Sequence, residues 1–105
     1  MTCQQYNSNT FITHFEKTGG LETPEYHDVI NYFKELSSTY PELSVFEMGE
    51  TDAGYPLHLV VYDSDGNTQL NTLKTSTKNK VLINNGIHPG ASDGIDPSML
   101  LLRDI

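Results

Sequence analysis

A short apolar run followed by strong turn residues constrains the fold of this chain more than any other feature. Residues 81–83, Val-Leu-Ile, follow a polar, lysine-bearing stretch, and the Asn-Asn-Gly of 84–86 and the Pro-Gly of 89–90 then break any regular structure. We expect the run to be a buried central strand. His88 would then lie just beyond its carboxyl end, where open α/β sheets tend to hold ligands.

A helix is expected directly after this turn. Asp96 is a residue type that caps helices by accepting from free backbone N–H groups, and Pro97 suits the first helical position. Met99, Leu100 and Leu102 then supply an apolar face that can pack on a sheet.

The upstream pattern predicts a helix and a β-hairpin. Thr23-Pro24 opens the helix and Tyr40-Pro41 closes it, and residues 43–50 and 55–63 are expected strands joined by a turn at 51–54. The second strand has apolar side chains on both faces, which favours layers on both sides. The predicted fold class is therefore α/β, the N-terminal portion of an α/β/α sandwich with a mixed sheet, in the order helix, β-hairpin, central strand, helix. The apolar face of the first helix consists of Tyr26, Val29, Ile30, Phe33, Leu36 and Tyr40.

Two segments carry a resemblance to a known family. Residues 84–104, NNGIHPGASDGIDPSMLLLRD, resemble the first zinc-ligand segment of the zinc carboxypeptidases, specifically the bacterial members related to carboxypeptidases A and B. Residues 26–63 are similar to the family's opening helix and two-stranded ribbon, with its GxTxxGxPLxLV turn at 49–60 and Tyr55 where arginine is common. The resemblance covers Thr23 to Ile105. It implies a hydrolase that removes C-terminal residues from a peptide substrate, with zinc as Lewis acid and activator of water.

The resemblance makes His88 a zinc ligand, but it also shows a gap in the ligand set. The family's glutamate ligand is expected three residues later, where this chain has Ala91, and a methyl group cannot coordinate a metal. Since a catalytic zinc normally has three protein ligands and a water, only His88 of the expected set is present. Asp93 is the nearest carboxylate, but relatives that keep the glutamate also carry aspartate at this offset, so we do not assign Asp93 as a ligand. No catalytic residue is assigned within the chain.

Residues 1–21 are expected to be an N-terminal lead-in that ends at Gly19-Gly20. The resemblance makes residues 22–105 the truncated N-terminal part of a zinc carboxypeptidase-like catalytic domain. The second zinc histidine, the substrate-binding arginine, the pocket tyrosine and the general-base glutamate would all lie beyond Ile105. Three hypotheses stay open. The chain is part of a zinc carboxypeptidase, a non-catalytic relative that binds peptide or glycan ends, or a fragment without independent function that self-associates through an uncovered sheet edge.

Charge and hydropathy exclude several kinds of partner. The formal net charge of -8 argues against nucleic acid and anionic membrane surfaces, because both require a basic protein surface. No stretch approaches the roughly 18 to 20 apolar residues of a membrane span. The single cysteine, Cys3, allows no internal disulfide. It is either an ordinary terminal cysteine or the lipidated start of an extracytoplasmic lipoprotein.

One further motif resembles a cation site. Asp63-x-Asp65-x-Asn67 is similar to the start of a calcium loop, but the EF-hand pattern needs glycine and glutamate where this chain has Thr68 and Lys74. We interpret it as a plain turn. Three other histidines lack metal-ligand spacing and are expected to be structural or at the surface: His14, His27 and His58.

Overall fold

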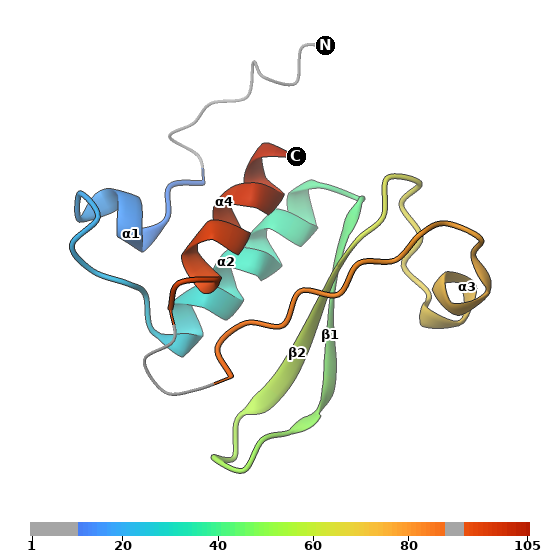
Figure 1. Ribbon diagram of the computed structural model, residues 1–105, viewed down its shortest axis with the longest axis horizontal. Helices are drawn as coiled ribbons and strands as arrows, with labels where there is room; N and C mark the ends of the chain where they lie inside the picture. Colours follow the sequence, from blue (N-terminus) through green and yellow to red (C-terminus); the bar gives the residue numbers. More distant parts are fainter. Residues whose placement is uncertain (1–10, 88–91) are drawn as a thin grey trace. The chain divides into compact units, whose positions relative to one another are not determined.

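The computed structural model describes residues 11–87 and 92–105 (Figure 1). It contains helices and a two-stranded antiparallel sheet, so the expected α/β class is confirmed. None of the described helices is long and apolar enough to cross a membrane. The elements in chain order are α1 (His14–Lys17), α2 (Tyr26–Thr39), β1 (Leu43–Glu50), β2 (Pro56–Tyr62), α3 (Leu70–Thr75) and α4 (Ile95–Asp104).

The chain divides into two compact units. The first comprises Met1–Tyr32 and Asn85–Ile105, and the second comprises Phe33–Asn84. Helix α2 contributes its first half to one unit and its second half to the other. The buried apolar side chains of the first unit are Phe11, Tyr32 and Met99, and those of the second are Phe33, Leu36 and Leu43.

Helix α2 forms where the apolar periodicity predicts it. Phe33 is buried and Leu36 is fully buried, so the predicted apolar face does face the protein interior. The helix ends just before Tyr40-Pro41, because the residue before a proline is disfavoured in helical geometry.

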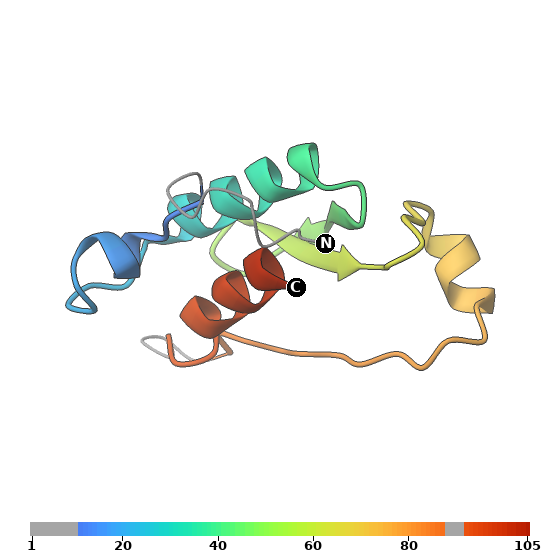
Figure 2. The ribbon, with the colours of Figure 1, turned by 90° about the horizontal axis from the view of Figure 1, so that it is seen from above.

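The hairpin also agrees with the prediction, to within a residue at the ends of its second strand. β1 and β2 pair in antiparallel register from Leu43 opposite Tyr62 to Glu47 opposite His58, and an irregularity follows before Glu50. Both views show the strands running side by side (Figures 1 and 2). In the turn, the Thr51 N–H donates to the carbonyl of Tyr55 at 2.8 Å.

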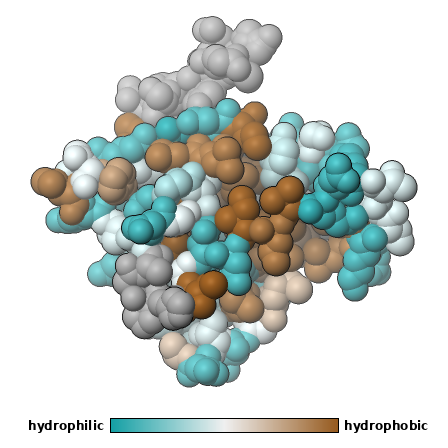
Figure 3. Space-filling model, in the orientation of Figure 1, coloured by the Kyte–Doolittle hydropathy of each residue, from teal (hydrophilic) through white to brown (hydrophobic). Residues whose placement is uncertain are grey.

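The predicted central strand does not form. Residues 81–87 have no regular secondary structure, and the side chains of Val81 and Leu82 are 86% and 80% exposed. A strand needs a partner for its backbone hydrogen bonds, and the sheet of the described residues contains β1 and β2 alone. In Figure 3, hydrophobic side chains lie at the surface along the path of this segment. The expectation of a buried, paired run was therefore wrong for the described structure.

Two short helices form in stretches where no helix was expected. Helix α1 lies in the expected lead-in, and α3 lies in the polar connection between 64 and 80. A capping box begins α1, in which the Thr13 hydroxyl accepts from the Glu16 N–H and the Glu16 carboxylate accepts from the Thr13 N–H. The Thr-x-x-Glu spacing at 13–16 was a readable signal for this helix.

Helix α4 confirms the predicted C-terminal helix, but its start differs. The N-cap is Gly94, and Asp96 is the second helical residue and Pro97 the third. The Asp96 side chain caps no backbone N–H; its Oδ2 accepts a hydrogen bond of 2.8 Å from the hydroxyl of Thr23. The capping role expected for Asp96 was wrong, because the polar partner that orients its carboxylate lies far away in the sequence.

Candidate functional site

The predicted metal-ligand positions His88 and Ala91 lie outside the described residues, as does Cys3. The described residues on either side of segment 88–91 contact one another. The Asn85 amide donates to the Ser98 hydroxyl at 2.6 Å, and that hydroxyl donates to the Gly94 carbonyl at 2.7 Å. A side chain at Gly94 would collide with the Asn85 carboxamide. Asn85 and Gly94 of the motif thus have a packing role in the first unit.

The described residues do not supply a zinc site. No group of three or more His, Cys, Asp or Glu side chains in 11–87 and 92–105 is placed to hold a metal ion. Asp93 is exposed, and it lines a pocket at the start of α4 together with Asp96.

The other three histidines have local partners. His14 Nε2 lies 2.9 Å from a carboxylate oxygen of Glu22, and His58 Nε2 lies 3.9 Å from one of Glu47. The His27 ring makes an edge contact with Tyr26, with centroids 5.1 Å apart. These surroundings agree with the expected structural roles.

The calcium-like motif is a turn whose carboxylates bind a lysine. The buried Asp63 carboxylate accepts from the Lys78 ammonium at 2.6 Å, the Asp65 N–H at 3.0 Å and the Asn67 amide at 2.7 Å. Lys78 also pairs with Asp65 at 2.6 Å. The hydrogen bond from Lys78, with those from Asp65 and Asn67, lowers the pKa of Asp63 to about 2. An ammonium group therefore occupies the position that a bound cation would need.

A second polar cluster joins the two chain segments of the first unit. Arg103 Nη1 donates to the Phe11 carbonyl at 3.1 Å and to Glu16 Oε1 at 2.7 Å, and the buried Tyr32 hydroxyl donates to the same Phe11 carbonyl at 2.9 Å. Burial raises the pKa of Tyr32 to about 12. Burial also acts to raise the pKa of Glu16, but the hydrogen bonds from Arg103 and Thr13 outweigh it and lower that pKa. This cluster is structural, since each polar group in it has a protein partner.

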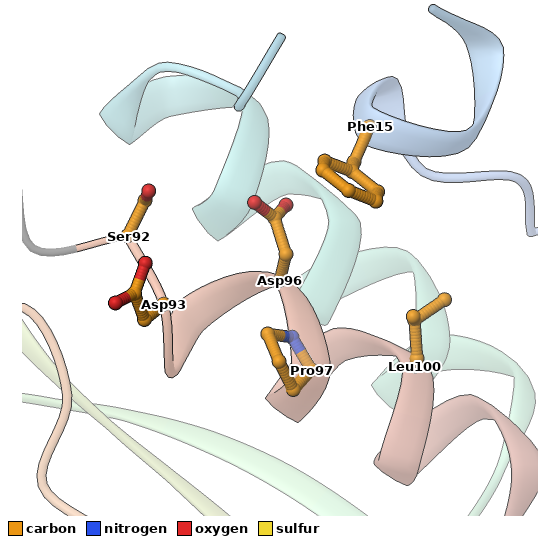
Figure 4. Close-up of a pocket in the computed structure, with 6 residues that line it drawn as sticks. All are labelled: Phe15, Ser92, Asp93, Asp96, Pro97 and Leu100. Carbon is orange, nitrogen blue, oxygen red and sulfur yellow. The ribbon is translucent and has the colours of Figure 1, made fainter. Parts of the chain in front are cut away.

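A pocket lies at the start of α4, and one of the residues that line it, Asp96, has a buried carboxylate oxygen without a hydrogen-bond partner in the described structure. It has a volume of about 340 Å³ and is lined by Phe15, Ser92, Asp93, Asp96, Pro97 and Leu100 (Figure 4). Asp96 is only 7% exposed, and its Oδ1 is buried without a hydrogen-bond partner in the described structure. The sequence pattern did not indicate this pocket, because an aspartate before proline at a helix start is usually a helix cap.

Comparison with known proteins adds no relative. No protein-family model, curated protein or solved structure matches the chain. The likeness to the zinc carboxypeptidases therefore stays a prediction that rests on the residues of 23–105. The pocket at the start of α4 is a separate observation that does not depend on that likeness.

Proposed function

We propose that this chain carries the first metal-ligand segment of a zinc carboxypeptidase-like hydrolase, with the ligand set interrupted at position 91. One observation carries the proposal: the NNGIHPG…DGIDPSMLLLRD pattern of 84–104, in which His88 stands at the family's histidine position. The helix, hairpin and C-terminal helix occur in the order that the resemblance implies, which supports it. The substrate class would be peptides with a free C-terminus.

The donor set present does not fit a catalytic zinc. His88 supplies one ligand, Ala91 supplies none, and the described residues contain no other group of three suitable side chains. We therefore derive no catalytic step for this chain and expect no peptide hydrolysis from it alone.

Restoring the carboxylate tests the family proposal. In a full-length chain that includes the expected second zinc histidine, Ala91→Glu should raise zinc affinity by more than the roughly 10- to 100-fold that outer-shell partners contribute, because the carboxylate binds the metal directly. Ala91→Gln is the matched control, with the same size and no charge. His88→Ala in the Ala91→Glu background should abolish the gain. Zinc affinity would be measured by isothermal titration calorimetry at neutral pH, and equal affinity in the Glu and Gln variants would reject the proposal.

A second candidate function follows from Ala91 itself. Loss of the metal ligand is the change expected in a relative that binds peptide or glycan ends without cutting them. Such a protein should bind C-terminal peptides or oligosaccharides equally well with and without a chelator. The absence of any binding at millimolar ligand would remove this candidate.

A further inference from the structure

We propose that Asn85 is a self-modification site, at which the side-chain amide is lost to give aspartate and isoaspartate, and that the Ser98 hydroxyl sets the rate of this loss. Asn85 is the one asparagine in the sequence that is followed directly by glycine. The reaction involves none of residues 88–91, so it is independent of the proposed zinc segment.

The reaction begins when the backbone nitrogen of Gly86 loses its proton to water or hydroxide and attacks Cγ of Asn85. A bond forms between this nitrogen and Cγ, the bond from Cγ to Nδ2 breaks, and Nδ2 takes up a proton and leaves as ammonia. Water then opens the succinimide ring. Opening at Cγ gives aspartate, and opening at the backbone carbonyl carbon gives isoaspartate, whose main chain is longer by a methylene. No oxidant or reductant takes part.

The backbone around Asn85 leaves this attack open. Residues 81–87 have no regular secondary structure, and Asn85 is exposed, so water reaches the site. Gly86 has no side chain to crowd its nitrogen, and its φ of 68° lies in the left-handed region that glycine adopts without strain. No backbone carbonyl among the described residues accepts a hydrogen bond from the Gly86 N–H, so no such bond opposes the loss of its proton.

The start of α4 restrains the carboxamide of Asn85. Its Nδ2 donates to the Ser98 hydroxyl at 2.6 Å, and this hydroxyl donates to the Gly94 carbonyl at 2.7 Å. Gly94 also lacks the Cβ that would collide with Asn85 Oδ1. All three residues belong to the first unit. Ring closure turns the carboxamide and expels Nδ2, so the hydrogen bond to Ser98 opposes it.

Other positions of similar sequence are less favourable. Asp65-Gly66 has the same small neighbour, but the Gly66 N–H donates to the Asp63 carbonyl at 2.8 Å, and a carboxylate is a poor target for attack by nitrogen. The Asn67 amide donates to the Asp63 carboxylate at 2.7 Å, a charged acceptor that holds it more strongly than a hydroxyl does. Asn85 should therefore react before them.

Conversion changes both the charge and the packing at this point. The product adds a negative charge to a chain whose formal net charge is already -8. It also loses the N–H that the Ser98 oxygen accepts. Because the Ser98 proton is donated to the Gly94 carbonyl, a carboxylate at position 85 faces an oxygen instead of a donor. The contact between residue 85 and α4 should therefore be lost as the protein ages.

The experiment incubates the full chain for weeks at neutral pH and follows each asparagine by proteolytic digestion and mass spectrometry, with anion-exchange chromatography to resolve the more acidic product. Aspartate and isoaspartate should appear at position 85 before any other asparagine of the described residues is converted. Asn85→Gln should abolish the product, because glutamine would have to close a larger and less favourable ring. Absence of conversion at position 85, or faster conversion of another described asparagine, would overturn the proposal.

A variant then tests the restraint. Ser98→Ala removes the acceptor of the Asn85 amide and places a good helix former in α4. The rate at position 85 should rise about two- to tenfold, the factor that corresponds to the loss of a typical hydrogen bond. Ser38→Ala is the matched control, because the Ser38 hydroxyl also donates to a backbone carbonyl within a helix but lies in the second unit. It should leave the rate unchanged.

Unfolding of the wild type gives a second measure that needs no variant. Guanidinium chloride releases the carboxamide from Ser98, so conversion at Asn85 should be at least about twofold faster in the unfolded chain than in the folded one at the same pH. Equal rates in folded wild type and folded Ser98→Ala, or in folded and unfolded wild type, would overturn the control assigned to Ser98.

Discussion

Replacing Arg103 by methionine should cost about 2 to 4 kcal/mol of unfolding free energy. The Arg103 side chain is 11% exposed and donates to the Phe11 carbonyl, a hydrogen bond of the charged kind worth about 1.5 to 3 kcal/mol. Its ion pair with Glu16, whose side chain is 34% exposed, adds at most about 1 kcal/mol because solvent screens it. Methionine keeps most of the apolar stem, so the loss is chiefly polar.

No buried group is orphaned by this substitution, which is why the estimate stays moderate. The Phe11 carbonyl keeps the hydrogen bond from Tyr32, and Glu16 keeps the donors of Thr13. A domain of this size has a total stability of about 5 to 15 kcal/mol, so the loss is still a large fraction of it.

Urea unfolding followed by circular dichroism measures the effect. With a slope near 2 kcal/mol per molar, the midpoint should fall by about 1 to 2 M. Lys17→Met is the matched control, because it removes the same charge from an exposed side chain that has no ion pair among the described residues.

The stabilising effect of Arg103 should depend on pH through Glu16. The pKa of Glu16 is lowered in the folded protein, so the stability that its carboxylate contributes is present above its ordinary pKa of 4.5 and is lost as the pH falls below it. The difference in urea midpoint between the wild type and Arg103→Met should therefore become smaller in acid. Equal midpoints for the Arg103 and Lys17 variants would refute the reasoning.

Four other predictions concern the second unit. The pKa of Asp63 is lowered from 3.8 to about 2, so the stability that its carboxylate contributes is complete above about pH 4 and is lost between pH 4 and pH 2. Over this pH range the urea midpoint should fall less in Asp63→Asn than in the wild type. Lys78→Met should raise the pKa of Asp63 measured by carboxyl NMR, whereas Lys80→Met should not, because Lys80 donates to carbonyls. Leu36→Ala should cost about 2 to 5 kcal/mol in thermal or urea unfolding, because Leu36 is fully buried. Leu82→Lys should reduce concentration-dependent self-association in sedimentation velocity; a wild type that stays monomeric at high concentration would contradict this.

Local patterns were sufficient to predict the elements that depend on nearby residues. The apolar periodicity of 26–40 predicted α2. Two strand-like segments on either side of the turn residues 51–54 predicted the hairpin. Both signals depend only on residues that are close in the sequence. The Thr-x-x-Glu spacing before α1 was equally local. It was missed because a four-residue helix offers no apolar periodicity to detect.

Features that depend on distant residues were not predictable in the same way. The Thr23 hydroxyl that orients Asp96 is 73 positions away, and the Phe11 carbonyl that receives Arg103 is 92 positions away. No spacing rule links such pairs. The apolar run of 81–83 shows the same limit, because its composition indicates a strand while the formation of a strand depends on a partner elsewhere.

Positions 91 and 96 differ in what the sequence alone can reveal about them. At position 91 a single residue type decides the chemistry, since alanine has no atom that can bind zinc wherever the segment lies. At Asp96 the residue type alone suggests only a helix cap. Its hydrogen bond from the Thr23 hydroxyl arises from a contact between residues that lie far apart in the sequence. A substitution at 91 therefore tests the family likeness, whereas a substitution at 96 tests a tertiary contact of the first unit.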